Sequence, residues 1–338
     1  MDRVVIIGLG LIGGSLGLAL KGAKIKDIEV IGVDVERDAV VAAQRKGAVD
    51  RVERPAEKAV ASANMVIVAT PILAVRDVFA TIGDALPAGC VVTDTASTKA
   101  HIMRWAEEFL PPHVHFVGGH PMAGKERPGI QGAEASLFRD AAYCIVPSAR
   151  ASQAAVETVV GLAQTVGSTP YFVDAEEHDM MVAGVSHLPL VLASALVAVT
   201  TRSPSWREMS KLASSGFRDT SRLASTDIAL STGIAGTNQA GLIRWIDGCI
   251  EVLKEYRDLI AQDSKAMQAR FDEAWEARER WLVNQKEPPR DKAMAEVPST
   301  ADRINEMLFG NLWEKLRRRE QQLLDRDGKG RQEREQDR

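Results

Sequence analysis

The stretch Val4-Val5-Ile6-Ile7-Gly8-Leu9-Gly10-Leu11-Ile12-Gly13-Gly14-Ser15 decides the fold of the first half of the chain. A β-branched run typical of a buried strand leads into glycines with the spacing Gly-x-Gly-x-x-Gly, and small residues typical of a closely packed helix follow. A second apolar run, Ile28 to Val33, ends in Asp34. This order predicts a βαβ unit of the dinucleotide-binding type.

Each glycine of this loop has an expected task. Gly8 makes the tight turn, Gly10 lets the backbone approach a pyrophosphate, and Gly13 lets the helix pack closely on the strand. The pyrophosphate is expected at the helix N-terminus, where free N–H groups favour an anion. The cofactor-binding residues predicted in this unit are Gly8, Leu9, Gly10, Leu11, Ile12, Gly13 and Asp34.

Asp34 bears on which dinucleotide is bound. A carboxylate at this position accepts hydrogen bonds from the adenosine ribose, and it would repel a 2′-phosphate, so NAD is favoured over NADP. Arg37 keeps NADP as a lesser alternative. A flavodoxin-like or other strand–turn–helix without a nucleotide is the competing interpretation, and Asp34 argues against it.

Length and composition narrow the class of protein. A chain of 338 residues is long enough for two domains with separate cores. A net charge of -4 and a pI near 6.0 give no electrostatic reason to expect nucleic acid or an anionic membrane as a partner. The cysteines are scattered without metal-type spacing, so no metal is expected. The apolar stretch from Leu188 to Val199 is shorter than the about 20 residues that span a bilayer, which predicts a soluble cytoplasmic protein.

The first half alternates strand-like and helical patterns. Because helical patterns separate most of the strands, we expect an α/β fold with a mostly parallel, doubly wound sheet and helices on both faces. The pattern leaves the direction of the last strands open. The expected strands are Val4–Ile7, Ile28–Val33, Met65–Ala69, Val91–Thr93, His115–Val117, Ala141–Val146 and Thr169–Val173.

The pattern of apolar residues changes near Asp174. From Glu176 to Met267 one helical pattern follows another and no strand is indicated. Met180 to Val199 is apolar almost all round, which predicts burial inside a helical domain or between subunits, and hence a homodimer. The predicted division is a dinucleotide-binding domain at residues 1–174, an all-α substrate and dimerisation domain at 175–284, and a linker, charged helix and tail at 285–338.

Loops at the carboxyl ends of the strands are where ligands bind in doubly wound sheets. Three of them carry polar or glycine-rich sequence: Thr70-Pro71, Asp94 to Lys99, and Gly118 to Gly124. Pro121 biases His120 toward an extended backbone, so the imidazole should project from the loop. Near a nicotinamide, neutral His120 could take a proton from a hydroxyl, and kcat would then fall on acidification through a pKa near 6–7. A loop-capping histidine is the equally weighted alternative.

The helical half supplies possible substrate contacts. Ser186-His187-Leu188-Pro189 predicts a helix start, because proline is tolerated in the first turn. Arg218 and Arg222 are four residues apart and are therefore expected on one helix face. Two guanidinium groups on one face form either a solvated salt-bridge surface, the commoner case, or a clamp for carboxylates.

These segments occur together in a recognisable order: the glycine loop, Asp94 with Ser97 and Lys99, His120 to Gly124, His178-Asp179, Ser186 to Pro189, and Gly216 to Arg222. In this combination the chain resembles the prephenate/arogenate dehydrogenase family of tyrosine biosynthesis, over roughly Met1 to Ile260. The fold of that family, a dinucleotide-binding domain followed by a helical dimerisation domain, agrees with the division above.

The resemblance implies oxidative decarboxylation of prephenate to 4-hydroxyphenylpyruvate with NAD as cofactor. His120 would take the proton of the C4 hydroxyl as hydride leaves C4, and Ser97 would hydrogen-bond His120 or that hydroxyl. Arg222 would pair with a substrate carboxylate, and His187 and Arg218 would line the same pocket. Thr70 and Pro71 complete the cofactor-binding set.

Three alternatives stay open on the sequence. The substrate could be arogenate. The chain could be another Rossmann-type enzyme, such as a β-hydroxyacid dehydrogenase or an imine reductase, which would normally show a catalytic lysine in the helical half. It could also be a nucleotide-sensing dimer, in which His120 would be idle.

Overall fold

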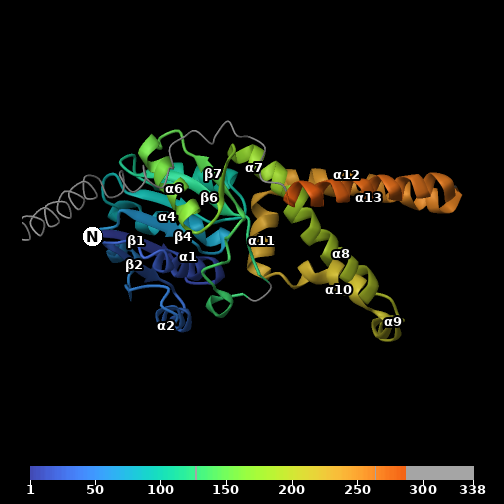
Figure 1. The fold of residues 1–338 in the computed structure, drawn as a ribbon, viewed down its shortest axis with the longest axis horizontal. Helices are drawn as coiled ribbons and strands as arrows, with labels where there is room; N and C mark the ends of the chain where they lie inside the picture. The colour runs from blue at the N-terminus through green and yellow to red at the C-terminus, as the bar shows by residue number, and fades with distance from the viewer. Residues whose placement is uncertain (126–127, 263, 287–338) are drawn as a thin grey trace, which may run out of the picture.

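The computed structural model describes residues 1–125, 128–262 and 264–286, and the charged helix predicted within residues 285–338 lies outside them. The described part consists of one sheet with helices around it and a helical extension (Figure 1). The strands are β1 (Asp2–Ile7), β2 (Ile28–Val33), β3 (Arg51–Val52), β4 (Met65–Val68), β5 (Val91–Asp94), β6 (His115–Pro121), β7 (Ala142–Pro147) and β8 (Thr169–Phe172).

The sheet has the order β3-β2-β1-β4-β5-β6-β7-β8. All neighbouring strands are parallel except β6 and β7, which are antiparallel. The strand order reverses between β1 and β4, and ligands of such sheets bind in the crevice at that point. Ile7 pairs with both Val33 and Val68, so the carboxyl ends of β1, β2 and β4 are level. The predicted doubly wound sheet is confirmed. Of the last strands, whose direction was left open, β7 is antiparallel to β6 and β8 is parallel to β7.

Helices cover both faces of the sheet, with a separate core on each face. Val4 and Ile6 of β1 belong to the core that includes Leu16 of α1, whereas Val5 and Ile7 belong to the core that includes Phe79 of α4. Burial on both faces explains why these strands read as continuous apolar runs. The helices of this half are α1 (Leu11–Gly22), α2 (Arg37–Arg45), α3 (Ala56–Val60), α4 (Val75–Ile82), α5 (Ala100–Phe109) and α6 (Gln153–Thr165).

One strand is longer than the sequence pattern predicts, and it carries the main candidate residue. β6 continues to Pro121, so His120 lies in the strand and not on a loop. The reason is the antiparallel neighbour, because β7 pairs His120 with Cys144 and Pro121 with Tyr143 and extends the ladder past the predicted end. The backbone of His120 is extended, as the following proline predicts.

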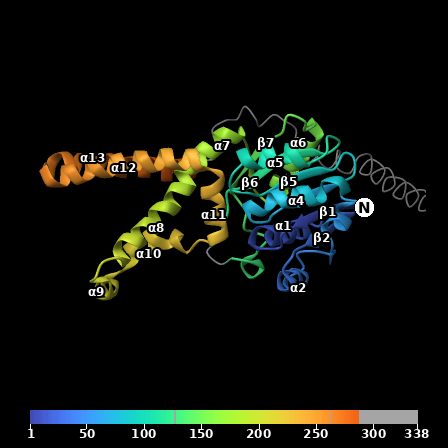
Figure 2. The ribbon, with the colours of Figure 1, turned by 180° about the vertical axis from the view of Figure 1, so that it is seen from behind.

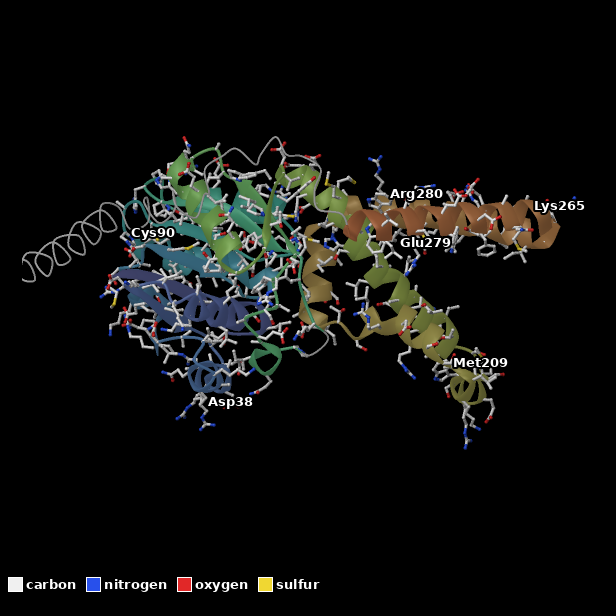
Figure 3. All side chains as sticks on the ribbon, in the orientation of Figure 1. Asp38, Cys90, Met209, Lys265, Glu279 and Arg280 are labelled. Atoms are coloured by element: carbon white, nitrogen blue, oxygen red, sulfur yellow. The ribbon has the colours of Figure 1, made fainter. Side chains whose placement is uncertain are left out.

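The second half is helical throughout the part that the structure describes, as predicted. Besides the long first helix, it contains α9 (Trp206–Leu212), α10 (Ser215–Ser221), the 3-10 turn η5 (Arg222–Ser225), α11 (Ile228–Thr237), α12 (Gln239–Gln262) and α13 (Ser264–Lys286). α8 (Leu188–Thr201) and α10 form one arm with α9 at its tip, and α12 and α13 form a second arm (Figures 1 and 2). Met209 and Lys265 mark the far ends of these arms in Figure 3. α11 contacts the sheet half, since its Ile234 is buried with Ile72.

The first helix of this half corrects the predicted helix start at Ser186. α7 (Ala175–Val182), a π-helical turn η4 (Ala183–His187) and α8 (Leu188–Thr201) form one continuous helix of 27 residues. Pro189 does not begin it. Its missing N–H and its ring disturb the hydrogen bonds of the preceding turn, and a π turn is a usual way for a helix to absorb such a disturbance.

This continuous helix is also longer than the apolar stretch read from the sequence. Ala175–Thr201 is long and apolar enough to cross a membrane by length and composition, with a mean hydropathy of 2.0, and the structure as described has one such helix. The stretch from Leu188 to Val199 is thus part of a longer apolar helix, and length and composition alone do not distinguish such a helix from the core helix of a soluble protein. Only 28% of its apolar window is buried, and Val185 and Val199 are 75% and 67% exposed, so a single chain does not bury this surface inside a helical domain.

Candidate active site

The glycine loop has the geometry that its spacing predicts. Gly8 has a φ of +97°, and a Cβ there would lie 2.5 Å from the carbonyl oxygen of Ala69. A Cβ on Gly13 would lie 1.9 Å from the Gly8 carbonyl oxygen, so only glycine allows this close packing. A Cβ on Gly10 would meet nothing within 4 Å. The backbone at Gly8 and Gly13 is thus packed closely against other parts of the chain. At Gly10 the space is open, so a ligand can approach the backbone there.

Polar groups around this loop fit a dinucleotide. Helix α1 begins at Leu11 with Gly10 as N-cap, and no side chain caps its first N–H groups. Thr70, at the end of β4, has a buried hydroxyl oxygen without a hydrogen-bond partner among the described residues. The Asp34 carboxylate accepts hydrogen bonds from the backbone nitrogens of Leu9 (2.6 Å) and Glu36 (2.8 Å), which holds it at the end of β2. Pro71 follows Thr70 and is exposed. An unsatisfied helix N-terminus, an orphaned hydroxyl and a fixed carboxylate can bind phosphate and ribose.

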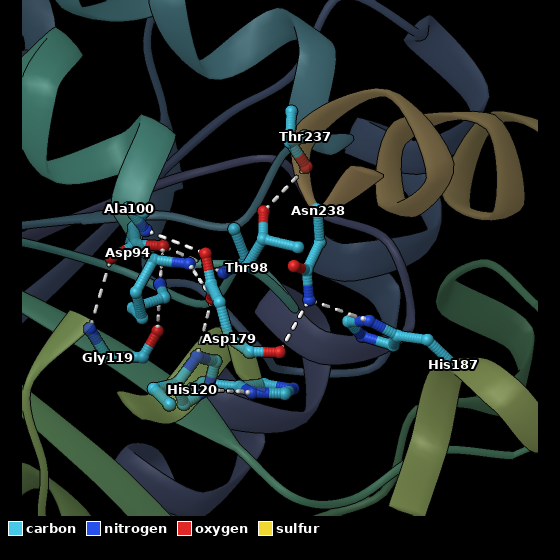
Figure 4. Close-up of polar contacts among 12 residues, drawn as sticks. Asp94, Thr98, Ala100, Gly119, His120, Asp179, His187, Thr237 and Asn238 are labelled. Atoms are coloured by element: carbon cyan, nitrogen blue, oxygen red, sulfur yellow. Dashed lines mark hydrogen bonds and ion pairs between the residues drawn. The ribbon is translucent and has the colours of Figure 1, made fainter. Parts of the chain in front are cut away.

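His120 belongs to a buried chain of side chains that joins the two halves of the protein. Its Nδ1 lies 2.9 Å from Nε2 of His178, and Nδ1 of His178 lies 2.8 Å from Oδ1 of Asp179 (Figure 4). Asp179 also accepts hydrogen bonds from the backbone nitrogens of Lys99 (2.6 Å) and Ala100 (2.9 Å). His120 comes from β6 and the other two from α7, so the candidate base is held by the helix that begins the second half.

A buried ion pair lies beneath this chain. The side chains of Lys99 and Asp94 are fully buried and form a salt bridge. Lys99 Nζ also donates to the Gly119 carbonyl at 2.6 Å, and Asp94 accepts from the Gly119 nitrogen at 3.1 Å and from the Ala96 nitrogen at 2.8 Å. Burial lowers the pKa of Lys99, and the Asp94 carboxylate opposes that shift. Together these groups fix the residue that precedes His120.

His187 lies buried in the same region, between α7 and α8. Its Nδ1 lies 3.3 Å from Nδ2 of Asn238, which also donates to the Asp179 carbonyl at 2.6 Å. An amide nitrogen can only donate, so Nδ1 of His187 accepts and its Nε2 carries the hydrogen. That Nε2 is buried, and hydrogen bonding between the ring and the backbone of Ser97 raises the pKa of His187 against the larger lowering effect of burial. The structure thus brings together two predicted site residues, His187 and Ser97.

Burial keeps both candidate histidines neutral. It is the largest cause that lowers the pKa of His120 well below the ordinary value of 6.5, and the neighbouring histidines and Lys99 act in the same direction. Burial also lowers the pKa of His187 to about 4. At neutral pH, His120 is therefore able to accept a proton and His187 acts as a neutral hydrogen-bond donor.

The structure does not bring every predicted site residue together. Ser97 is half-buried in the turn between β5 and α5, and among the described contacts the hydrogen-bond partner of His120 is His178, not Ser97. Arg218 lies on α10, and Arg222 directly follows this helix with an α-helical backbone at the start of the 3-10 turn η5, so their position on one face stays a prediction. Both are exposed on the arm that leads away from the sheet (Figure 1).

Sequence reasoning gave no role to four residues that shape the site: His178, Asp179, Lys99 and Asn238. The signal for the first two is an adjacent His-Asp pair at the point where the helix passes from Glu176 and Glu177 to apolar residues, since buried polar groups need partners. Lys99 follows Asp94 by five residues after a buried strand, which is compatible with an ion pair but does not require one. Asn238 is a lone polar residue between two helices, and nothing in the sequence distinguishes it from a cap.

The comparisons with known proteins agree with this geometry. Residues 16–171 match the family described as prephenate dehydrogenase, nucleotide-binding domain, and residues 174–273 match prephenate dehydrogenase, dimerization domain. Prephenate dehydrogenase of Bacillus subtilis (strain 168) is 33% identical over 268 residues, which are 78% of this chain and 71% of that protein. Cyclohexadienyl dehydrogenase of Zymomonas mobilis subsp. mobilis is 31% identical over 279 residues, 82% of this chain and 94% of that protein.

A solved structure is similar over most of the described chain. Prephenate dehydrogenase from Aquifex aeolicus, in complex with hydroxyphenyl propionate and NAD+, has a TM-score of 0.77 and 25% identity, and it covers 83% of this chain and 98% of its own. Two consecutive family matches, relatives above 30% identity and a shared fold point the same way. The chain belongs to the prephenate dehydrogenase family.

Proposed function

We propose that this chain catalyses the NAD-dependent oxidative decarboxylation of prephenate to 4-hydroxyphenylpyruvate, a step of tyrosine biosynthesis, in the cytoplasm. The observation that carries the proposal is the position of His120. This histidine is buried near the carboxyl end of β6, at the same edge of the sheet as the glycine loop. Membership in the family supports the same reaction. It also removes the reason to consider a β-hydroxyacid dehydrogenase, an imine reductase or a nucleotide sensor.

The side chains divide the work of this reaction. NAD, when bound, supplies the acceptor for the hydride that leaves C4 of prephenate. His120 takes the proton of the C4 hydroxyl, which it can do because burial keeps its ring neutral. Ser97, at the neighbouring end of β5, is proposed to orient that hydroxyl. His187 is proposed to turn its buried N–H from the backbone of Ser97 to a polar group of the substrate.

The proposal is tested by an absorbance assay. Purified protein with prephenate and NAD should produce NADH together with 4-hydroxyphenylpyruvate in equal amounts. Arogenate is the second candidate substrate, because one of the relatives is named a cyclohexadienyl dehydrogenase. Parallel assays with arogenate decide between them, and a protein that forms NADH with neither substrate would overturn the proposal.

NAD is expected to be preferred over NADP by about 100-fold in kcat/KM. The Asp34 carboxylate is held in place by two backbone N–H groups, so it cannot easily turn away from a 2′-phosphate, and a like-charge contact of this kind costs several kcal/mol. Steady-state kinetics with both cofactors measures the ratio. Asp34→Ser should narrow it, and equal efficiencies in the native protein would instead indicate that Arg37 binds the phosphate.

We propose that residues 1–174 hold the cofactor and that residues 175–284 make the protein a homodimer. The helix Ala175–Thr201 leaves apolar side chains exposed in a single chain, and Leu212 on the same arm is 84% exposed. A solvent-exposed apolar surface of this kind is typical of an interface. Light scattering at micromolar concentration should give twice the chain mass of 36.7 kDa, and a stable monomer would contradict the proposal.

Arg222→Ala is expected to raise the KM for prephenate by about 10–100-fold with a smaller effect on kcat. The loss of one charge-assisted hydrogen bond to a carboxylate costs about 1.5–3 kcal/mol. Because Arg222 lies on the exposed arm, this role requires that dimer assembly place the arm beside a substrate site. Arg45→Ala on α2 is the matched control. An unchanged KM in Arg222→Ala would show that Arg222 belongs to a solvated salt-bridge surface and does not bind the substrate carboxylate.

A further inference from the structure

The hydrogen bonds around His120 define which of its nitrogens carries a hydrogen. The Asp179 carboxylate can only accept, so the hydrogen at 2.8 Å from it sits on Nδ1 of His178. Nε2 of His178 is then a lone pair, and it must accept across the 2.9 Å contact from Nδ1–H of His120. Nε2 of His120 is left as the free lone pair. Each step follows from the donor and acceptor capacity of the group before it.

Asp179 is well fixed for this task. Three hydrogen bonds reach its carboxylate, two of them from the backbone of Lys99 and Ala100 at the start of α5. His178 and Asp179 are 1% and 5% exposed, so water does not compete for these contacts. The order His120–His178–Asp179 therefore runs from the candidate base to a buried carboxylate without a gap.

We propose that His178 and Asp179 are positioning residues that form a proton relay with His120, setting its tautomer and taking up the positive charge that arises when His120 accepts the substrate proton. This inference rests on the proposed function. It gives His178 the task of sharing the charge that His120 gains, and it gives Asp179 the task of stabilising that charge.

In the relay each proton returns to the atom from which it came. The O–H bond of the C4 hydroxyl breaks and its proton bonds to Nε2 of His120, while the N–H bond at Nδ1 breaks and that proton bonds to Nε2 of His178. Hydride passes from C4 to NAD, and loss of CO2 returns the electron pair of the broken C–C bond to the ring. The oxygen, now a phenolate, takes back the proton from Nε2 of His120, and the proton on His178 returns to Nδ1. No proton is released overall.

The charges that face His120 favour a positive charge on His178 over one on His120. His187 is neutral, and Lys99 is cationic but paired with Asp94, so neither stabilises a positive ring at His120. On His178 the same charge lies beside the Asp179 carboxylate. Moving the proton by one ring thus takes the charge from an unfavourable buried position to a paired one.

Nitrogen NMR on histidine-labelled protein tests the tautomers without turnover. The chain has 6 histidines, and His178→Phe leaves the other rings in place, so the signals can be assigned. We expect His120 to be protonated at Nδ1 and bare at Nε2 in the native protein, and to lose this single tautomer in His178→Phe. A native His120 that carries its hydrogen on Nε2, or a tautomer unchanged in His178→Phe, would overturn the relay.

Kinetics separate positioning from storage. The carbonyl of Gln in His178→Gln can still accept from Nδ1–H of His120, but it cannot hold a proton. We expect His178→Gln to keep the native tautomer by NMR and the native KM values, with kcat lowered by about 100-fold. Native kcat in His178→Gln would remove the storage step, and a raised KM with unchanged kcat would make the role structural.

Thr98→Val is the matched control. Thr98 forms a buried 2.8 Å hydrogen bond with Thr237 that also joins the two halves of the chain, and it takes no part in the relay. Thr98→Val should leave both the tautomer of His120 and kcat unchanged. If Thr98→Val lowered kcat as much as His178→Gln does, the effect of His178→Gln would be explained by loosened packing and the storage step would be overturned. If the native protein does not oxidise prephenate, the proposed function fails, while the NMR result still decides the tautomer.

Discussion

His120→Asn is expected to lower kcat by about 10²–10⁴-fold, the range that general base catalysis contributes, while the binding of prephenate and NAD stays largely intact. Asparagine keeps a hydrogen-bonding group beside the C4 hydroxyl but cannot take its proton at neutral pH. Steady-state kinetics with the native protein as reference measures the change. His115→Asn, at the other end of β6, is the control for replacing a histidine in this strand and should keep native kcat.

The pH profile gives this prediction a second readout. Only the neutral ring is a base, and burial lowers the pKa of His120 well below 6.5. Activity should therefore persist as the pH falls through 6.5 and decline only at the lowered pKa, so the acid limb lies below the pH 6–7 that an ordinary histidine would give. His120→Asn should lack this limb. If His120→Asn kept near-native kcat and an unchanged acid limb, the base would lie elsewhere, and His187 would be the next candidate.

The fold of the first half could be predicted because local pattern and global structure agree there. Gly8 needs a positive φ and Gly13 has no room for a Cβ, so the glycine spacing reports real backbone constraints. Strands buried on both faces appear as apolar runs in the sequence. The short elements β3 and α3 were missed because two and five residues are too few to show a period.

The site could be predicted only in part, because its contacts join residues that are distant in the chain. His120 was found through its own loop sequence, but its partner His178 lies 58 residues away and depends on how α7 packs against the sheet. Pro189 was read as a helix start because a proline in the first turn is common, whereas here a π turn carries the helix through it. A local pattern cannot distinguish these cases, since tertiary packing decides between them.

The pKa of His120 could not be predicted from the sequence either. A histidine in a sequence suggests an ordinary pKa, and only the structure shows the burial that lowers it. Arg218 and Arg222 are expected on one face from their spacing, and this stays a prediction, since α10 ends just before Arg222 and a 3-10 turn follows. Spacing rules hold only while the helix type stays constant.

Lys99→Met is expected to lower the free energy of unfolding by about 3–5 kcal/mol, because it leaves the Asp94 carboxylate buried without its counter-charge. The side chains of both residues are fully buried, so water cannot replace the ammonium group. The Gly119 carbonyl loses its donor as well, which should loosen the backbone next to His120 and lower kcat. Urea denaturation measures the stability, and the same protein in the prephenate assay measures the second effect.

The matched control for this loss is Lys211→Met, which removes an exposed ion pair with Glu208 at 2.6 Å. Both of those side chains are more than half exposed, and such pairs contribute about 0–1 kcal/mol. A double variant, Asp94→Asn with Lys99→Met, should recover part of the stability because the unpaired charge is gone, although its amide oxygen can accept from only one of the two backbone nitrogens of Ala96 and Gly119. Equal small losses of unfolding free energy in Lys99→Met and Lys211→Met would show that the buried pair does not hold Gly119 in place. A double variant less stable than Lys99→Met would assign the loss to packing and backbone hydrogen bonds instead of charge.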